Sequence, residues 1–321
     1  MSADEWRPLA DKDVLLARAK LLQDIRLFFA DAGVLEVETP IMSRYSNTDP
    51  QLLPVKVAYQ SSAQAPAEAR YLQTSPEFAM KRLLVAGSGP IYQICRVFRN
   101  GELGRRHNPE FSMLEWYRPG YDEHQLMDEV AALVKSVLPE ISPQSYSYQQ
   151  LFLSHLNIDP FTVDADELRE LASQKLDLSF QDQDLSADAW LDLLFSHVIE
   201  PRLDGAVFVY DYLPSQAALA EVERNAAGLK VARRFELIID GMEIANGYRE
   251  LRDPREHRHR FEQDLKKTGE TGRRADAYLL AAMEHGLPAC AGVALGLDRL
   301  LMLQCKVNSI EEVLSFPFTR A

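Results

Sequence analysis

Residues 93–117 combine basic and acidic side chains that could bind an anion next to an amine. The second half of this stretch alternates like a β-strand, so four side chains share one face: Phe111, Met113, Glu115 and Tyr117. A face with a carboxylate and a phenol is poorly suited to a dry core. Arg99 ends the preceding strand-like run, and the loop after it carries further basic and polar residues, namely Arg105, Arg106, His107 and Asn108. We therefore expect an anion site that faces a carboxylate-lined pocket, although each residue alone also fits a solvated surface.

A second acidic candidate lies at the start of a predicted helix within residues 71–87. Ser75 is a favourable N-cap residue, Pro76 suits the first helical position, and Glu77 falls in the first turn. The Glu77 carboxylate could accept hydrogen bonds from a substrate amine. Its alternative role is to stabilise the helix dipole, an interaction worth about 0.5 kcal/mol. This segment by itself favours the simpler role.

Two more carboxylates follow a predicted hairpin turn. The Asp240-Gly241 pair is a strong two-residue turn signal between two apolar runs. Glu243 and Glu250 are seven residues apart, which places them on opposite faces of a regular strand, but a bulge at residues 246–247 could bring them to one side. Two carboxylates beside bound phosphates suit Mg²⁺. The alternative, that both are solvated, has equal weight.

The last candidate segment is residues 288–303, where small residues precede an apolar helix. Gly292 and Gly296 allow the backbone to approach a ligand closely, and Arg299 near the start of the helix could bind an anion. Tight packing between a strand and a helix explains the two glycines equally well. This segment indicates an anion-binding site only when it is considered together with the other segments.

The elements that must position these residues can be inferred from hydrophobic periodicity. Apolar residues at helical spacing predict a helix over residues 15–29. Residues 142–205 differ in character, because short helical patterns at 164–174 and 187–199 are separated by turns rich in Asp and Ser. They hold no cluster of candidate catalytic residues. We therefore predict a single catalytic domain over residues 1–321, with a helical insertion at about 142–205.

The composition is that of a soluble globular protein. The chain has 321 residues, of which 46% are hydrophobic and 26% charged, and its formal net charge is −13. The acidic excess argues against a broad nucleic-acid-binding surface. Three widely spaced cysteines without a CxxC pair argue against disulfides and structural zinc. The N-terminus lacks a signal-peptide pattern and no run of about 18 apolar residues occurs. We therefore expect a cytoplasmic protein without a membrane span.

Taken together, these segments resemble the three signature motifs of class II aminoacyl-tRNA synthetases, in the lysyl branch. The predicted helix and strand before Pro40 resemble motif 1, which builds the dimer interface in that family. FRNGELGRRHNPEFSMLEWY resembles motif 2, GVALGLDRLLML resembles motif 3, and the segments around Glu77 and Glu243 match the lysyl group. The resemblance covers about residues 15–120 and 206–321. It implies an α+β fold with a mostly antiparallel sheet flanked by helices, rather than a doubly wound parallel sheet.

The chemistry implied by the resemblance is carboxylate activation by ATP with Mg²⁺. A substrate carboxylate attacks the α-phosphate, pyrophosphate leaves and an acyl-adenylate remains. By position, Arg99 and Arg299 would be the catalytic groups that hold the phosphates, and Glu243 and Glu250 would hold the metal. The set implied for ATP is Arg99, Asn100, Gly101, Glu102, His107, Asn108, Phe111, Glu243, Ile244, Gly296 and Arg299. The set implied for an amine-bearing substrate is Ser75, Pro76, Glu77, Glu115, Tyr117, Glu250 and Ala294.

Two departures from the lysyl pattern bear on these roles. In lysyl-tRNA synthetases the motif 2 arginine is followed by Asn-Glu, whereas here Asn100 is followed by Gly101, with Glu102 one place later. Motif 3 usually reads Gly-x-Gly-x-Gly, and here Ala294 stands at the middle glycine. An extra methyl group on a pocket wall can change substrate preference by about 1–3 kcal/mol. We therefore expect Ala294 to disfavour ordinary L-lysine.

The resemblance is closer to a truncated paralogue than to a complete lysyl-tRNA synthetase. Complete enzymes carry an anticodon-binding barrel before motif 1, and here motif 1 starts near residue 15, which leaves no room for a barrel. The truncated paralogues attach (R)-β-lysine, with L-lysine as a poorer substrate, to a lysine ε-amine of elongation factor P. This relationship implies elongation factor P as the acceptor, a homodimer, and no use of tRNA.

Three other functions stay open at this point. A lysine-activating tRNA synthetase fragment would acylate tRNA, which the missing barrel opposes. An asparagine synthetase that uses ammonia would need an aspartate pocket, which Glu77 and Glu115 oppose. A non-catalytic nucleotide-binding regulator would have lost key groups, and Gly101 is the one change in that direction. Amino-acid-dependent pyrophosphate exchange distinguishes these possibilities.

Overall fold

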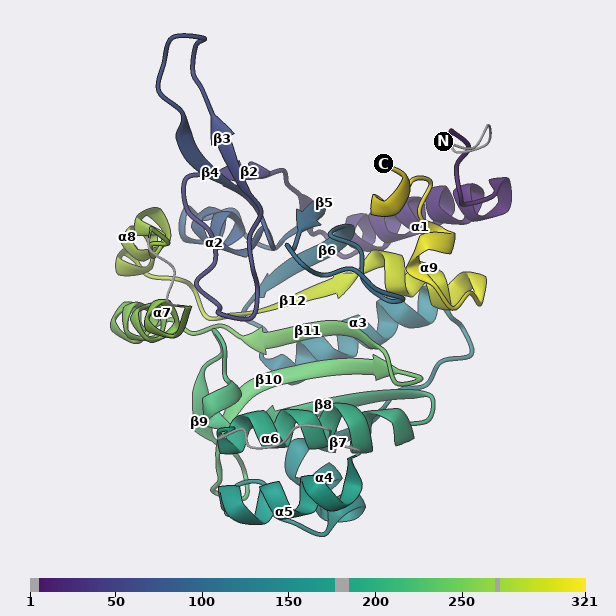
Figure 1. The fold of residues 1–321 in the computed structure, drawn as a ribbon, viewed down its shortest axis with the longest axis vertical. Helices are drawn as coiled ribbons and strands as arrows, with labels where there is room; N and C mark the ends of the chain where they lie inside the picture. The colour runs from purple at the N-terminus through teal and green to yellow at the C-terminus, as the bar shows by residue number, and fades with distance from the viewer. Residues whose placement is uncertain (1–5, 177–184, 269–271) are drawn as a thin grey trace. The chain divides into compact units, whose positions relative to one another are not determined.

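The structure is a computed structural model that describes residues 6–176, 185–268 and 272–321 (Figure 1). The chain divides into two compact units. The first unit comprises Met1–Gly120 with Leu251–Ala321, and the second comprises Tyr121–Glu250. The segment predicted as a helical insertion belongs to the second unit. Its status as an insertion into a single catalytic domain stays a prediction.

The first unit contains a short sheet next to helices from both ends of the chain. The helices are α1 (Lys12–Asp31), α2 (Glu77–Val85), α7 (Pro254–Thr268), α8 (Ala277–His285) and α9 (Leu297–Cys305). The strands are β1 (Leu35–Glu36), β2 (Met42–Ser43), β3 (Lys56–Tyr59), β4 (Glu68–Leu72), β5 (Ile91–Phe98), β6 (Glu110–Pro119) and β12 (Cys290–Gly296). Strands β1, β5, β6 and β12 are neighbours in that order, and β2, β4 and β3 form a separate sheet.

The pairing of β5, β6 and β12 is antiparallel and free of register shifts. The β5–β6 pair runs from Ile91 opposite Tyr117 to Phe98 opposite Glu110, and the β6–β12 pair is equally regular. Paired residues on antiparallel strands point to the same face of the sheet. The predicted alternation of residues 111–117 is therefore confirmed, and so is the mostly antiparallel sheet.

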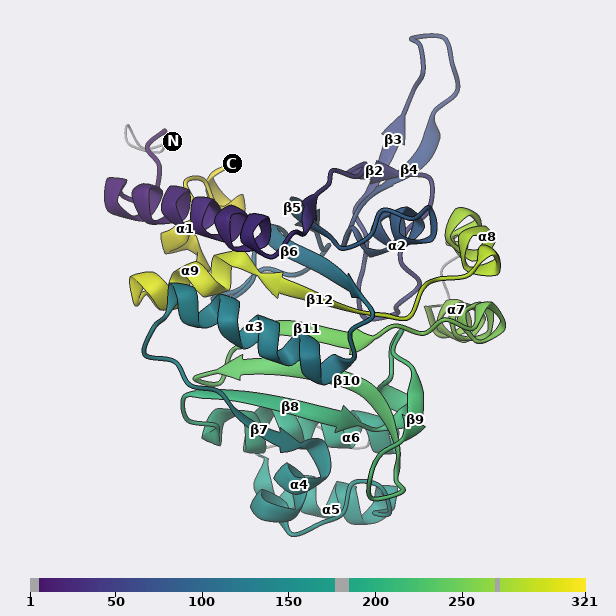
Figure 2. The same ribbon diagram turned by 180° about the vertical axis from the view of Figure 1, so that it is seen from behind.

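Helix α1 covers one face of these strands (Figure 2). The Phe29 ring stacks on Tyr92 with 4.4 Å between centroids and meets Trp116 edge-on at 5.4 Å. All three side chains are buried, and each contributes about 1.5–3 kcal/mol through the apolar area it removes from water. Tyr92 and Trp116 alternate along their strands with Gln93 and Glu115. The polar candidates therefore lie on the face opposite α1.

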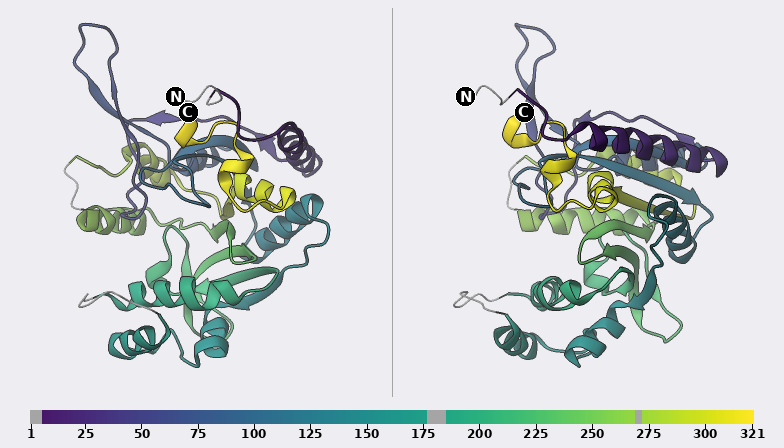
Figure 3. Two further views of the ribbon diagram at one scale, coloured as in Figure 1. Left: turned by 45° about the vertical axis from the view of Figure 1, so that its right-hand side comes forward. Right: turned by 90° about the vertical axis from the view of Figure 1, so that its right-hand side faces the viewer.

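The segment before helix α1 that the structure describes lies beside the C-terminal segment within the first unit (Figure 3). The N–H groups of Leu9 and Ala10 donate to the carbonyls of Ser315 and Leu314 at 2.8 and 3.3 Å. Two 3₁₀ turns, Ile310–Val313 and Phe318–Arg320, complete this C-terminal segment. In the described parts of the chain no helix is long and apolar enough to cross a membrane. The three cysteines are free.

The second unit combines a twisted sheet with short helices. The helices are α3 (Glu123–Val137), α4 (Tyr148–Leu156), α5 (Ala165–Lys175) and α6 (Ala187–Leu194), followed by a π-helical turn (Phe195–Ile199) and 3₁₀ turns (Glu200–Arg202 and Pro214–Gln216). The strands are β7 (Gln144–Ser147), β8 (Ala206–Tyr212), β9 (Val222–Arg224), β10 (Lys230–Ile239) and β11 (Glu243–Arg249). Strands β11, β10, β8 and β7 are neighbours in that order, and β9 also pairs with β10.

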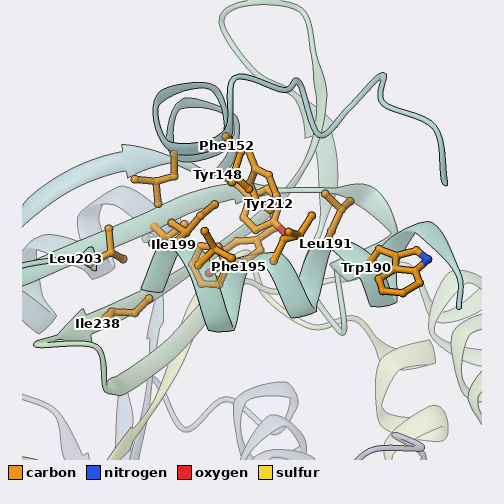
Figure 4. Close-up of a cluster of buried hydrophobic side chains, with 14 of the residues drawn as sticks. Tyr148, Phe152, Trp190, Leu191, Phe195, Ile199, Leu203, Tyr212 and Ile238 are labelled. Atoms are coloured by element: carbon orange, nitrogen blue, oxygen red, sulfur yellow. The ribbon is translucent and has the colours of Figure 1, made fainter. Parts of the chain in front are cut away.

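A cluster of buried apolar side chains joins these helices to β8 and β10 (Figure 4). The Tyr148 ring packs against Phe152 and Phe195, with centroid distances of 4.7 and 5.5 Å. Further members come from α6, the turns after it and the strands: Trp190, Leu191, Ile199, Leu203, Tyr212 and Ile238. The helical patterns predicted at 164–174 and 187–199 are confirmed as α5 and as α6 with its π-helical turn.

Strands β10 and β11 form the predicted hairpin. Asp240 and Gly241 both have positive φ, 48° and 64°, which is the backbone that a two-residue Asp-Gly turn adopts. The predicted position of the bulge at residues 246–247 is wrong. Ile238 pairs with Glu243 and Leu237 pairs with Ala245, so Ile244 is the extra residue. Residues 245–248 pair regularly with β10, which leaves the irregularity next to the turn.

Candidate active site

Glu115 is a buried carboxylate on β6, and both of its oxygens accept hydrogen bonds. The Tyr117 hydroxyl donates to Oε1 at 2.6 Å, and the Ser75 hydroxyl donates to Oε2 at 2.7 Å. Burial raises the pKa of Glu115 to about 7, and the charge of Glu77 adds to this effect, whereas the two hydrogen bonds and Lys81 oppose it. The carboxyl group is therefore about half ionised near neutral pH. A cation placed beside it would favour the ionised form.

Glu77 begins helix α2 and is paired with a lysine one turn further on. Its Oε1 accepts a hydrogen bond from Lys81 Nζ at 2.6 Å, and the Lys81 side chain is fully buried. Sequence reasoning missed Lys81, although a Glu and a Lys four residues apart on a helix signal such a pair. The predicted helix start is wrong by one residue. Helix α2 begins at Glu77, so Pro76 directly precedes it. The Ser75 hydroxyl accepts the Glu77 N–H at 3.0 Å, as a capping side chain does.

Regular strand pairing places one residue on each side of Glu115. Gln93 of β5 lies opposite Glu115 on one side, and Ala294 of β12 lies opposite it on the other. Residues paired in this way have Cβ atoms about 5 Å apart and point to the same face. The Ala294 methyl group therefore belongs to the same wall as the carboxylate. The structure brings together most of the residues predicted for an amine-bearing substrate: Ser75, Pro76, Glu77, Glu115, Tyr117 and Ala294.

Arg99 and Phe111 lie together at the other end of the β5–β6 pair. The Arg99 guanidinium carbon is 5.1 Å from the Phe111 ring centroid. Glu102 approaches the same guanidinium, with 3.8 Å between Oε2 and Nη1, because Gly101 turns the chain with a φ of +83°. The Asn100 N–H donates to a backbone carbonyl at 2.8 Å. Glu102 thus reaches the arginine from one position later than in the lysyl pattern.

Arg299, in the first turn of α9, contacts the loop that joins β5 to β6. Its Nη2 lies 2.7 Å from His107 Nε2, and its Nε donates to the Arg106 carbonyl at 3.3 Å. Arginine can only donate, so His107 Nε2 is the acceptor in this contact. The residue before α9, Gly296, has its backbone next to the Arg299 side chain. Both predicted phosphate-binding arginines therefore flank one loop.

The Asn108 side chain ties this loop to the C-terminal segment. Its Nδ2 donates to the Glu110 carbonyl at 2.6 Å, and its Oδ1 accepts the Phe318 N–H at 3.0 Å. The Arg105 carbonyl accepts a further bond from the Ile310 N–H at 2.9 Å. Asn108 is buried and both ends of its amide hold the loop in place. Its role in binding ATP stays a prediction.

Asp298 connects the three predicted motifs. It is not among the site residues predicted from the sequence. Its Oδ1 accepts a bond from Arg18 of α1 at 2.5 Å, and its Oδ2 accepts the Ser112 N–H of β6 at 2.7 Å. Asp298 is buried and directly precedes Arg299. Arg18 also donates to the Val313 carbonyl at 2.8 Å. The acid thus fixes the start of α9 against both α1 and β6.

In the second unit, the bulge at Ile244 adds one residue to β11 and so reverses, from that point on, which face of the strand each side chain lies on. Glu243 and Glu250 therefore fall on the same face of the strand, although they are seven residues apart. Glu250 and Ile244 are buried, and Glu243 is partly exposed. Carboxylate oxygens suit Mg²⁺, and two suffice where substrate phosphates complete its coordination. No group of three His, Cys, Asp or Glu residues in the described ranges could hold a metal. The donors fit an ion that arrives with ATP; their role stays a prediction.

A buried polar network holds β10 against β11 next to Glu243. Glu236 accepts the Tyr212 hydroxyl at 2.8 Å and is paired with Arg234, which also donates to Asn246 Oδ1 at 3.2 Å. Burial raises the pKa of Glu236; Arg234 lowers it and the charge of Glu243 raises it further. Because each member has a partner on another strand, the network fixes the hairpin that carries Glu243.

Comparisons with known proteins cover nearly the whole chain. The model of the family "tRNA synthetases class II (D, K and N)" matches residues 5–320. The relative named elongation factor P–(R)-β-lysine ligase in Edwardsiella ictaluri is 49% identical, with 98% of each chain covered. The protein of that name in Proteus mirabilis is 49% identical over 99% of this chain and 98% of its own length. The one in Hamiltonella defensa is 47% identical over 99% of each.

Proposed function

This chain belongs to the class II tRNA synthetase family (D, K and N), and we propose that it is an ATP-dependent ligase that attaches (R)-β-lysine to elongation factor P. The relatives that match it over nearly its full length are named for this reaction. The structural observation that supports the proposal best is Glu115. A buried carboxylate with a pKa near 7, close to a second acid, suits a substrate that brings its own positive charge.

The first step is activation of the amino acid. An oxygen of the β-lysine carboxylate attacks the α-phosphorus of ATP, the bond to the β-phosphate oxygen breaks, and pyrophosphate leaves. Arg99 stabilises the charge on the α-phosphate and Arg299 holds the outer phosphates. The Phe111 ring supports adenine. Glu243 and Glu250 would hold Mg²⁺, which would neutralise phosphate charge.

The second step transfers the acyl group. The neutral ε-amine of a lysine on elongation factor P attacks the acyl carbon, the bond to the phosphate oxygen breaks, and AMP leaves. The attacking nitrogen loses one proton as the amide forms. We assign no base to this step. L-lysine is a poorer substrate in this proposal because the Ala294 methyl group takes up space in the pocket beside Glu115.

The substrate amines occupy the acidic end of the site in this proposal. Arg99 lies at one end of β5, so the carboxylate that reacts at the phosphate lies towards that end. The amine farthest from the carboxylate then reaches Glu115 and Tyr117. Glu77 completes the acidic pair, and its partner Lys81 limits the total negative charge of the pocket. This charge balance matches a cationic substrate rather than aspartate.

The protein acts as a homodimer in this proposal, through α1 and the strand after it. Leu16, Leu27 and Leu35 are 58, 55 and 57% exposed, which is unusual for three large apolar side chains on adjacent elements. A second copy would cover them. A cytoplasmic location and the absence of tRNA from the reaction remain predictions.

Amino-acid-dependent exchange of labelled pyrophosphate into ATP tests the activation step. We expect exchange with (R)-β-lysine and slower exchange with L-lysine. An Arg99→Gln variant is expected to lose exchange with both, because the charge on the α-phosphate is then unopposed. Absence of exchange by the wild-type protein with either amino acid would favour a nucleotide-binding regulator. Lysine-dependent acylation of tRNA would favour a synthetase fragment instead.

A further inference from the structure

Gln93 has a buried carbonyl oxygen that is left without a donor. The residue lies on β5 and only 3% of its surface is exposed. Among the described residues, its Oε1 has no hydrogen-bond partner. Buried amide oxygens almost always accept a hydrogen bond, since leaving one unpaired is unfavourable. The missing donor therefore points to a ligand.

The position of Gln93 indicates what kind of ligand this is. Strand register puts Gln93 opposite Glu115 and on the same face, so that Glu115 lies between Gln93 and Ala294 across the sheet. The Gln93 amide also hydrogen-bonds the Cys95 thiol, which occupies its NH₂ side. Gln93 is six residues from Arg99, about 20 Å along the strand. It therefore lies at the acidic end of the site, far from the phosphates.

We propose that Gln93 Oε1 accepts a hydrogen bond from the terminal ammonium of the bound amino acid and so helps to select substrates that end in an amine. This inference rests on the proposed function. An ammonium group has three N–H donors that point in different directions. The Glu115 carboxylate lies on one side of the ammonium and cannot accept from all three. A neutral amide supplies one more acceptor without a third negative charge. A carboxylate at position 93 would instead repel Glu115 and Glu77.

A Gln93→Met variant tests the proposal, because methionine has a similar length but accepts hydrogen bonds only weakly. In pyrophosphate exchange, we expect KM for (R)-β-lysine to rise roughly tenfold to hundredfold, as for loss of a bond to a charged group. KM for ATP should not change. With (R)-3-aminohexanoate, which lacks the terminal amine, wild type and variant should have equal KM values. Gln304→Met is the matched control, since Gln304 also has a buried Oε1 without a partner but lies on α9.

An equal rise in KM for both compounds, or no rise for (R)-β-lysine, would overturn the role of Gln93. If Gln93→Met does not fold, Gln93→Asn serves instead, because it keeps the amide and withdraws the oxygen by one methylene. The same selective rise in KM for (R)-β-lysine is expected there, and an unchanged value would equally overturn the proposal. Absence of exchange by the wild-type protein would count against the proposed function and not against Gln93.

Discussion

Among single residues, Glu115 makes the clearest prediction about pH. Its pKa of about 7 in the free protein means that half of the carboxyl groups are protonated at neutral pH. A substrate ammonium favours the ionised form, so binding lowers this pKa and releases a proton. The amino acid therefore binds more tightly as pH rises through 7. KM for (R)-β-lysine in pyrophosphate exchange is expected to fall roughly tenfold between about pH 6 and pH 8.

Glu115→Gln is the matched variant for this pH profile. Glutamine keeps the shape and one acceptor but does not titrate in this range, so KM should be high and independent of pH. Assays at saturating ATP separate this effect from ionisation of the nucleotide site. A wild-type KM that stays constant across the same range would contradict the assignment of Glu115 to the substrate amine.

Ala294 makes a prediction about specificity. Its methyl group lies on the same face of the sheet as Glu115, on the neighbouring strand. Ala294→Gly removes this group, and we expect kcat/KM for L-lysine relative to (R)-β-lysine to rise about tenfold, the lower part of the range for one methyl group. Ala291→Gly is the control, because Ala291 lies on the same strand but pairs with Arg118 on the opposite face. A ratio that responds equally to both substitutions would remove the specific role of Ala294.

The connection between helix α1, strand β6 and helix α9 makes a prediction about stability. Arg18 and Asp298 form an ion pair whose side chains are 17% and 2% exposed. Removing one partner leaves the other charge buried, so Arg18→Gln should lower the free energy of unfolding by about 2–4 kcal/mol. Urea denaturation measures this change. Lys20→Gln is the control, since its partner Asp24 is on the exposed side of α1 and such pairs contribute at most about 1 kcal/mol. Equal effects of the two substitutions would contradict the linking role of Asp298.

The elements with local signals could be predicted from the sequence. The β5–β6 pair and the β10–β11 hairpin follow from alternation and from Asp240-Gly241, which involve only neighbouring residues. The bulge was misplaced because its position depends on pairing with β10. A glycine at position 247 favours a bulge when only the sequence is considered. In the structure, residues 245–248 pair regularly with β10, so no bulge occurs there.

The residues that position the site were missed for a related reason. Asp298 is bonded to Arg18 and to Ser112, which are 280 and 186 residues away in the chain. The importance of Gln93 depends on its register with Glu115 and on the donors around it. Neither fact leaves a pattern in the sequence. Lys81 is different, because its spacing from Glu77 would have been sufficient to find it.

For the molecule as a whole, the exposed leucines predict an assembly. Leu16→Glu combined with Leu27→Glu should convert a dimer into a monomer, because the substitutions would bury charge at the contact of two α1 helices. Light scattering coupled to size-exclusion chromatography measures the mass. Leu153→Glu is the control, since Leu153 is 46% exposed on α4 in the second unit. A wild-type protein that is already monomeric at micromolar concentration would contradict the dimer.

The acceptor is the remaining part of the proposed reaction, and elongation factor P is proposed because the relatives are named for it. Formation of the acyl-adenylate does not distinguish elongation factor P from other acceptors, because synthetases and ligases both form this intermediate. The acceptor must therefore be tested with elongation factor P itself and with tRNA in parallel, under the same conditions.

Intact-mass spectrometry of elongation factor P after incubation with this protein, ATP, Mg²⁺ and (R)-β-lysine tests the central claim most directly. We expect elongation factor P to gain the mass of one β-lysyl group on a single lysine, with little gain when L-lysine replaces (R)-β-lysine. Omission of ATP, or the Arg99→Gln variant, should abolish the gain. An unchanged mass of elongation factor P, together with active pyrophosphate exchange, would show that the adenylate is passed to another acceptor and would contradict the account.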